Sequence, residues 1–308
     1  METTQETKEP QKARFERTSK PDLKNYYREE TVEPVEFVTL WKGEVSESEC
    51  DFKFSDGSYV LPNEIATIYP KLIDVLAKDK LYRDDPKARL EELEFDEKSG
   101  RLRLKFKETS YGKSAVTNQS MEIRPAGWHK TIRDLLEPGP ELSILKDSKC
   151  SNQAGVNCLV VTSDNYLILQ EATQNKMEGA EQLGSSASGS MDFKIPHITP
   201  FEVMQAELFE ELNLSQEEAS GLKLFAVARD LNNGGKPELF FILRPDLTFG
   251  EIEKRKPTDP DKEIKQLIPV KMAGLNKEEL DEKISELIKA NTTTSTKAAL
   301  YYFSRGAI

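Results

Sequence analysis

The second half of the chain carries apolar segments in an order that limits the fold more than any other feature. "AGVNCLVVTSDNYLILQEA" (154–172) consists of two apolar stretches around a polar turn, the pattern of a β-hairpin. "LKLFAVARDL" and "KPELFFILRP" follow as strands joined by an Asn-Asn-Gly-Gly turn, and "IKQLIPVKM" is a further short strand. With one helix inside this series and one after it, the order β-β-loop-α-β-β-β-α predicts an α/β fold of the α+β kind. We expect a mixed sheet sandwiched between helices.

The helix inside this series is expected to begin at Thr199-Pro200 and to carry an acidic face. Threonine is a favourable N-cap residue, and proline is favourable in the first helical turn. In "AELFEELNL" (206–214), Glu207, Glu210 and Glu211 have the spacing i, i+3, i+4, which places them on one face of a helix. An adjacent apolar stripe with a spacing of four is expected to face the core (Met204, Leu208 and Leu212).

Glutamates that share a helical face repel one another by roughly a few tenths of a kcal/mol for each pair in water. A divalent cation reverses the sign, since Mg²⁺ prefers carboxylate oxygens, water and substrate phosphates as ligands. A solvated acidic face is the common alternative for such a helix. Here the helix follows the loop "GSSASGSMD" (184–192), whose small residues let the backbone approach a ligand closely. This context favours a metal site.

The first half of the chain is divided by its composition. Residues 1–32 are polar and charged with few aliphatic residues, and we predict that they form a disordered tail. Residues 33–140 contain strand-like segments and are predicted to form a smaller, β-rich N-terminal domain. A polar, Pro-rich connector then places the domain boundary near 140–150, so that residues 150–308 form the second domain. Because the connector is short, we expect the first domain to contribute to the pocket of the second.

Two local predictions concern the N-terminal domain. "ARLEELEFDEKSGRLRLKFKETSY" (88–111) alternates on both arms of a Lys-Ser-Gly turn and predicts a hairpin. "DFKFSDGSYVL" (51–61) is expected to be a strand broken by a turn at Asp56-Gly57.

Composition argues against several classes of function. The net charge of −11 argues against a DNA or RNA binder, because phosphate contacts need clustered Lys and Arg. No apolar run approaches the roughly 20 residues of a membrane span, and the N-terminus lacks the apolar region of a secretory signal. The three cysteines have no close metal-ligand spacing, which suits a reducing compartment. These features predict a cytoplasmic protein, and a homodimer stays open because the sequence does not give the oligomeric state.

The acidic helix, the small-residue loop and the flanking hairpins together resemble the Nudix hydrolase family. The family signature is Gly-x5-Glu-x7-Arg-Glu-U-x-Glu-Glu-x-Gly-U, where U is a bulky aliphatic residue. "ELFEELNL" (207–214) matches its second half, and "GSMD" (189–192) resembles its opening element with an insertion before the helix. The strand pattern agrees from residue 152 to residue 308.

The signature is degenerate at three positions. Ala206 stands where the family has Arg, Asn213 where it has Gly, and Ile198 where it has the early Glu. In the family the Arg holds a glutamate in its metal-binding rotamer, which Ala206 cannot do. Asn213 is a milder change, because Asn tolerates a left-handed helix end. Loss of the early Glu would shift metal binding toward Asp192 or Glu202.

The resemblance implies hydrolysis of a nucleoside diphosphate linked to another moiety, by attack of water on phosphorus with Mg²⁺ or Mn²⁺ as the cofactor. It implies that Glu207, Glu210 and Glu211 are metal ligands and catalytic residues. Glu263, on a later acidic loop, is a further candidate for the general base; the alternative is a surface charge. The expected partner is therefore a small-molecule nucleotide-diphosphate substrate.

Three further residues are candidates for substrate binding. Gly189 and Ser190 belong to the small-residue loop before the acidic helix. Arg229 follows a strand and is a candidate for a phosphate contact, with an exposed strand-end arginine as the alternative.

The N-terminal domain followed by "ETSYGKSAVTN" is similar to the Nudix subgroup that cleaves UDP-sugars. In that subgroup a Tyr and a later Thr-Asn pair precede the catalytic domain, here Tyr111 and Thr117-Asn118; the alternative is that these residues end a hairpin. A second function stays open beside hydrolysis. Because Ala206 replaces the family's Arg, the chain could be a Nudix-fold module that binds a nucleotide or a protein with weak or no catalytic activity.

Overall fold

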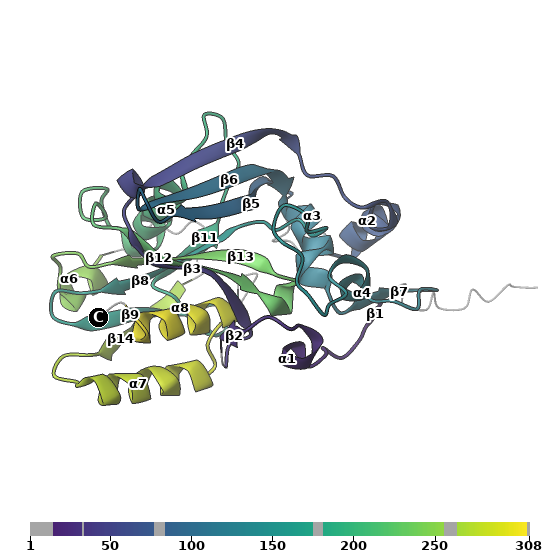
Figure 1. Cartoon of the computed structure of the whole chain (residues 1–308). Helices are drawn as coiled ribbons and strands as arrows, with labels where there is room; N and C mark the ends of the chain where they lie inside the picture. Colours follow the sequence, from purple (N-terminus) through teal and green to yellow (C-terminus); the bar gives the residue numbers. More distant parts are fainter. Residues whose placement is uncertain (1–14, 33, 77–83, 175–180, 256–263, 307–308) are drawn as a thin grey trace, which may run out of the picture.

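The computed structural model describes residues 15–32, 34–76, 84–174, 181–255 and 264–306 (Figure 1). The strands are β1 (Phe15–Arg17), β2 (Thr31–Val32), β3 (Phe37–Val45), β4 (Cys50–Ser58), β5 (Pro86–Asp96), β6 (Arg101–Ser110), β7 (Ile123–Pro125), β8 (Gly155–Val161), β9 (Tyr166–Ala172), β10 (Leu183–Gly184), β11 (Ala187–Ser190), β12 (Lys223–Asp230), β13 (Lys236–Leu243) and β14 (Ile264–Lys271). The helices are α1 (Leu23–Tyr26), α2 (Asn63–Leu76), α3 (Tyr111–Val116), α4 (Ile132–Leu136), α5 (Pro200–Leu212), α6 (Phe249–Glu253), α7 (Lys277–Lys289) and α8 (Thr294–Ser304).

The largest sheet formed by the described residues has nine strands and is mixed. Its order is β10-β9-β8-β13-β12-β3-β2, with β11 paired to β8 and β14 paired to β9. β8 and β13 run parallel, whereas the other pairs of this sheet are antiparallel. The predicted α+β class with a mixed sheet is confirmed.

Strand β13 shows that both faces of this sheet are covered. Every residue of "KPELFFIL" is buried, as expected for a strand with packing on both sides. Leu239 and Phe241 belong to one apolar cluster, whereas Phe240 and Ile242 belong to another. This division follows from the alternation of side chains along a strand, and it makes the sheet the middle layer of the molecule.

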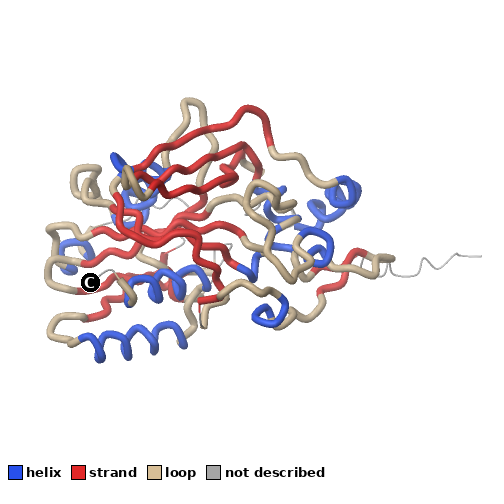
Figure 2. Tube along the Cα trace, viewed as in Figure 1, coloured by secondary structure: helices blue, strands red, loops and turns tan. Residues whose placement is uncertain are grey.

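Different elements cover the two faces (Figures 1 and 2). Ile284 of α7 and Leu300 of α8 share an apolar cluster with Phe240, so these two helices cover one face. Leu208 of α5 and Phe106 of β6 belong to the cluster on the other face. That face is therefore covered by α5 and by a second sheet of order β4-β6-β5. The sheet sandwiched between helices is thus confirmed, with the three-stranded sheet as an additional cover.

The predicted hairpins are confirmed, and one predicted turn is wrong. β5 and β6 pair antiparallel around Gly100, which has a φ of +69°; β12 and β13 also pair antiparallel. The turn expected at Asp56-Gly57 does not end the strand, because β4 continues to Ser58. Its pairing with β6 instead shifts between Ser55 and Ser58, and Gly57 has a φ of +76° that suits such a bulge.

The first half of the chain contributes to both sheets. β3 pairs with β12 along most of its length and separates β12 from β2. β4, β5 and β6 form the second sheet, which packs over the first. The division of the chain at 140–150 stays a prediction, but the pairing of β3 with β12 places residues from both predicted domains in one sheet.

Residues 15–32 differ from the disordered tail that the sequence predicts. β1 pairs with β7, and Leu23 and Tyr27 are 0% and 2% exposed. The Tyr27 hydroxyl donates a hydrogen bond to the Glu137 carbonyl oxygen at 3.0 Å. Leu23 and Tyr27 are thus buried although the segment as a whole is polar, and the average composition of the segment does not indicate this.

Among the described residues, none of the helices combines the length and the apolar character that a membrane crossing requires.

Leu23→Ala tests whether this N-terminal segment is part of the cooperative fold. We expect the free energy of unfolding to fall by about 2–5 kcal/mol, because removal of a fully buried leucine side chain leaves a cavity. Lys24→Ala, at an exposed position of the same helix, is the control and should change it by less than about 0.5 kcal/mol. Urea denaturation measures both values. A small change for both variants would contradict the structure.

Candidate functional site

Helix α5 begins and ends as its sequence predicts. Thr199 caps the helix: its hydroxyl accepts from the Glu202 backbone N–H at 3.1 Å, and the Glu202 carboxylate accepts from the Thr199 N–H at 2.7 Å. Pro200 occupies the first turn. Asn213 ends the helix in the left-handed conformation, with φ 53° and ψ 44°, which agrees with its tolerance for this region.

The apolar stripe of α5 fixes which side of the helix faces the sheet. Met204, Leu208 and Leu212 are at most 2% exposed and belong to the apolar cluster that α5 shares with β8. With this stripe buried, Glu207 is half-buried, Glu210 is exposed and Glu211 is buried. The three predicted metal ligands therefore lie in three different environments.

Glu207 lies against the backbone of β11. A Cβ atom added at Gly189 would be only 1.9 Å from the Glu207 Oε1 atom. The carboxylate thus occupies the space that any other side chain at position 189 would need. The sequence assigned Gly189 to substrate binding, and the structure shows the close approach of Glu207 to it.

Glu211 is held by two neutral donors. It is 6% exposed, and its Oε2 atom accepts from Gln170 Nε2 at 2.9 Å and from the Ser188 backbone N–H at 3.3 Å. Gln170 is buried on β9, so its amide fixes the carboxylate from the side of the sheet. Burial raises the pKa of the nearby Cys158 thiol, and the charge of Glu211 raises it further.

A lysine lies near the outer part of this acidic face. Lys194 has a raised pKa, chiefly because Asp192 accepts a hydrogen bond from it, with smaller contributions from the charges of Glu210 and Glu207. Asp192 forms ion pairs with Lys87 at 2.6 Å and with Lys194 at 2.8 Å. Burial alone would raise the pKa of Asp192, but the two lysine contacts outweigh it and lower the pKa. Lys194 therefore lies beside the glutamates, and Lys87 shares its Asp192 partner.

The donor chemistry of this site fits a divalent cation, although the described residues contain no assembled group of three or more His, Cys, Asp or Glu side chains that could hold one. Glu207 and Glu211 both reach the β11 backbone at neighbouring positions, 189 and 188. Carboxylate oxygens are the ligands that Mg²⁺ prefers. Of the two residues expected to replace the missing early Glu, Asp192 is engaged by lysines and Glu202 by the helix cap.

Of the remaining predicted residues, Ser190 follows Gly189 on β11, whereas Arg229 lies apart from the acidic face. The Ser190 hydroxyl accepts from Gln153 Nε2 at 2.7 Å. Arg229 is not an exposed strand-end residue, since it is 2% exposed on β12, and strands β8 and β13 separate β12 from β11. Its Nε donates to the Gly235 carbonyl oxygen at 2.8 Å. Glu263 lies outside the described residues.

Two polar features of the sheet escaped the sequence interpretation. The sequence does not indicate the role of Gln170, because a single amide side chain in an apolar strand is common. Glu238 is buried on β13, pairs with Lys236 at 2.5 Å and accepts from Asn157 Nδ2 at 2.9 Å. A Cβ atom added at Gly155 would be 2.0 Å from the Glu238 Oε2 atom, so Gly155 is required by close approach, as Gly189 is.

Comparison with known proteins gives matches among solved structures only. No family model and no curated protein matches the sequence. Among solved structures, the chain is similar to the DR0079 protein of Deinococcus radiodurans, with 17% identity and a TM-score of 0.35 over 48% of this chain and 80% of that one. It is also similar to a MutT protein from Methanosarcina mazei Go1 (14% identity, TM-score 0.33, 50% of this chain and 94% of that one). An ADP compounds hydrolase shares 13% identity, with a TM-score of 0.29 over 74% of this chain and all of that one. Similarity at this level carries no argument about family or activity.

Gly189→Ala tests the contact between Glu207 and β11. We expect the free energy of unfolding to fall by about 1–3 kcal/mol, because the new Cβ atom and the Glu207 carboxylate cannot occupy the same space. Glu207→Ala in the same chain should restore part of this loss, a coupling that a double-mutant cycle measures. Gly184→Ala is the control, since its nearest neighbouring atom would be 3.9 Å away. Additive effects of the two substitutions would show that Glu207 lies elsewhere.

Proposed function

We propose that the chain is a Nudix-type hydrolase that cleaves a nucleoside diphosphate linked to another moiety, with Mg²⁺ or Mn²⁺ as cofactor. The observation that supports this best is the placement of Glu207 and Glu211. They lie on successive turns of α5, and both carboxylates reach the backbone of β11, where only a glycine leaves room for Glu207. This placement brings two like charges to neighbouring positions of β11, where Gln170 and the Ser188 N–H donate to Glu211.

In this proposal each residue has a separate role. Glu207 and Glu211 would hold the cation, and Glu210 would join them from the exposed side of the helix. When bound, the cation would offset the charge of the diphosphate and lower the pKa of a bound water. Lys87 and Lys194 would attract the substrate phosphates, since both ammonium groups lie at Asp192 near the acidic face. A glutamate of α5, or Glu263, would accept the proton of the attacking water.

Gln170 would orient Glu211 in place of the arginine that Ala206 replaces. Its amide donates to Glu211 Oε2 at 2.9 Å and to the Ser186 carbonyl oxygen, so the amide is itself fixed. A neutral donor would position the carboxylate without cancelling the charge that attracts a cation. The substitution at 206 is then compatible with turnover.

The finer proposal of a nucleotide-sugar substrate is supported by the sequence resemblance at Tyr111 and Thr117-Asn118. Asn118 is fully buried and donates from Nδ2 to the Asn233 carbonyl oxygen at 2.8 Å. Thr117 accepts at its hydroxyl from the Ser151 N–H. In the proposal, Thr117 and Asn118 hold the segment that connects the two halves of the chain in place. Other residues of the N-terminal half then contact the substrate. The Ala88 N–H of β5 donates to the carbonyl oxygen of Met191, the residue that follows β11. This contact supports the proposal because it brings the N-terminal half of the chain next to the acidic site.

A nucleotide-binding or protein-binding module with weak turnover is the second candidate. It is favoured by the exposure of Glu210, which leaves two of the three expected ligands at β11. We also propose that the protein acts in the cytoplasm, where its three free thiols would stay reduced.

Glu211→Gln and Glu210→Gln test the proposed activity. Each should abolish cation-dependent turnover with the fold intact, because the amide keeps the size of the side chain and loses the charge that binds Mg²⁺. The assay is release of products from a panel of nucleotide-sugars, dinucleotides and nucleoside triphosphates. Mg²⁺ should raise the Tm of the native protein more than that of either variant. Glu217→Gln, at an exposed position beyond the helix, is the control. Turnover by Glu211→Gln at the native rate would contradict the proposal, and Mg²⁺ binding without any turnover would favour the binding module.

Gln170→Ala and Ala206→Arg together test how Glu211 is oriented. Loss of the amide donor should lower turnover by about 10- to 100-fold, the usual effect of removing a residue that positions a metal ligand. Ala206→Arg should give no gain, because Glu211 already has its donors. Steady-state rates with saturating Mg²⁺ measure both effects. A large gain from the arginine with no loss from Gln170→Ala would assign the orienting role to position 206.

A further inference from the structure

A series of three stacked rings runs from the apolar core to the surface beside α5. Phe106 of β6 is fully buried, Phe54 of β4 is half-buried and His197 is exposed. Phe54 is stacked on Phe106, with ring centroids 5.7 Å apart and an angle of 26° between the ring planes. His197 is stacked on Phe54 with a centroid distance of 4.3 Å and an angle of only 8°. His197 is therefore the solvent end of this series.

Phe193 supports the His197 ring from its side. The Phe193 centroid lies 4.9 Å from that of His197 and 6.1 Å from that of Phe54. Together with the 4.3 Å between His197 and Phe54, these distances give nearly a right angle at His197. Phe193 thus lies beside the ring and does not cover the face that points away from Phe54. Because His197 is exposed, this face is left to solvent.

The loop that carries His197 is fixed at both ends. On the side of β11, the Phe193 N–H donates to the Pro86 carbonyl oxygen at 3.3 Å. On the side of α5, the hydroxyl of the N-cap residue Thr199 donates to the Glu47 carboxylate at 2.6 Å. The flat surface of His197 is therefore already formed, and a ligand that binds on it has little loop ordering to oppose it.

The same loop connects this ring surface to the acidic face of α5. Lys194 is three residues before His197, and its ammonium group pairs with Asp192 at 2.8 Å. The hydrogen bond with Asp192 is the main cause of its raised pKa, and the charges of Glu210 and Glu207 add to it. A flat ring surface, an ammonium group and two glutamates thus lie along one loop and the helix that follows it. A nucleotide has matching parts, since it carries a flat base and phosphate groups.

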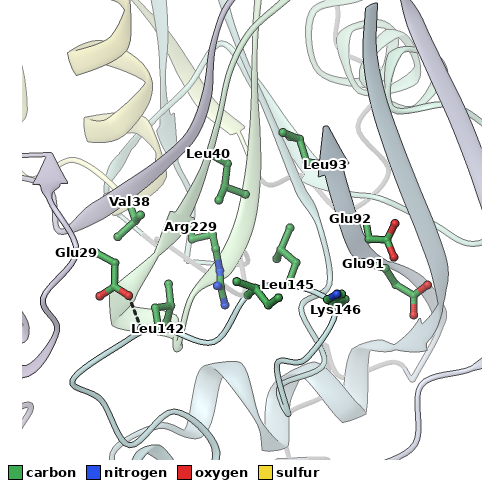
Figure 3. A pocket seen from close by; sticks show the side chains of 11 residues that line it. Glu29, Val38, Leu40, Glu91, Glu92, Leu93, Leu142, Leu145, Lys146 and Arg229 are labelled. Atoms are coloured by element: carbon green, nitrogen blue, oxygen red, sulfur yellow. Dashed lines mark hydrogen bonds between the residues drawn. The ribbon is translucent and has the colours of Figure 1, made fainter. Parts of the chain in front are cut away.

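The cavity between the two sheets offers no such surface (Figure 3). It has a volume of about 360 Å³ and is bounded by β3, β12, β5 and the segment 142–146. None of the described residues that line it is aromatic. The Arg229 guanidinium in its wall donates to the carbonyl oxygens of Gly235 and Ser143. A ligand with a flat ring is therefore matched by the surface at His197 and not by this cavity.

We propose that the exposed face of His197 binds the nucleobase of the substrate by stacking, with the phosphates directed toward Lys194 and the acidic face of α5. This inference rests on the proposed function for the class of substrate and adds the place where its base binds. Histidine and other aromatic side chains are common stacking partners of unpaired bases. Stacking tolerates any base, because every base has a π-face. We therefore expect the site to accept both purines and pyrimidines.

AMP, UMP and ribose 5-phosphate test the proposal on the full-length protein. All three carry one phosphate on a ribose and lack the diphosphate that the proposed reaction cleaves, so binding is measured without turnover. The chain has two histidines. The second one, His129, is exposed between β7 and α4, on the opposite side of Figure 1 from α5, and is the internal control.

AMP and UMP should move the ring-proton NMR signals of His197 upfield, because a stacked base shields these protons, and should leave the His129 signals in place. Ribose 5-phosphate, which has no base, should give no upfield shift of either histidine. Absence of an upfield shift of His197 with both nucleotides, or the same shift with ribose 5-phosphate, would overturn the proposal.

Variants measured by isothermal titration calorimetry assign the affinity to the ring. His197→Ala should weaken AMP binding by about tenfold or more, the usual effect of removing one stacked ring. His197→Phe should keep the affinity, because it keeps a flat ring. Ile195→Ala is the control, at a position of the same loop that is 88% exposed, and should bind AMP as the native protein does. An equal loss in Ile195→Ala, or a loss in His197→Phe as large as in His197→Ala, would contradict stacking on His197.

The result for the base site is separable from the result for hydrolysis. Upfield shifts of His197 with AMP and UMP, in a protein that hydrolyses none of the nucleotide panel, would support the base site and refute the hydrolase. Hydrolysis of that panel with the same KM in His197→Ala as in the native protein would support the hydrolase and refute the base site.

Discussion

Burial of the parallel pair β8–β13 on both faces is the constraint on which the rest of the structure depends. Every residue of both strands is buried, and alternate side chains enter two separate apolar clusters. Two covers are therefore needed, because an uncovered face would expose a continuous apolar surface to water. α7 and α8 provide one cover. α5 and the second sheet provide the other, and the burial of one side of α5 determines where its glutamates lie.

Buried charges are held in several ways in this molecule. Glu211 accepts hydrogen bonds from an amide and a backbone N–H, and Glu238 pairs with Lys236. Buried arginines instead donate to carbonyl oxygens of distant segments. Arg133 reaches the carbonyl oxygens of Leu231 and Asn232 and also pairs with Glu122, and Arg89 reaches the carbonyl oxygens of Leu145 and Ser148. The arginines connect irregular segments that lack ladder hydrogen bonds, since each guanidinium has five N–H donors.

The strands and the acidic helix could be predicted from sequence because their signals are local. The alternation of apolar and polar residues predicted the hairpins, and Thr199 with Pro200 predicted where α5 begins. The pairing of β3 with β12 could not be predicted, since nothing within either strand specifies a partner at the other end of the chain. For the site, spacing placed Glu207, Glu210 and Glu211 on one helical face, but their different burial depends on β11 and β9. Arg229 was expected to follow a strand, but it lies within β12 and is buried, with Ser143 of the irregular segment 142–146 as a partner.

The pairing of β3 has a consequence for the order in which the chain can fold during synthesis. β3 ends at Val45 and is synthesised before its partner β12, which begins only at Lys223. Its contacts with the last helix come later still: Thr39 Oγ1 meets the Tyr302 hydroxyl at 2.8 Å, and Lys42 Nζ donates to the Arg305 carbonyl oxygen at 2.5 Å. The edge of β3 that pairs with β12 therefore stays unpaired until β12 has been made. Contacts between residues so far apart in sequence slow folding, and an unpaired strand can associate with other chains in the meantime.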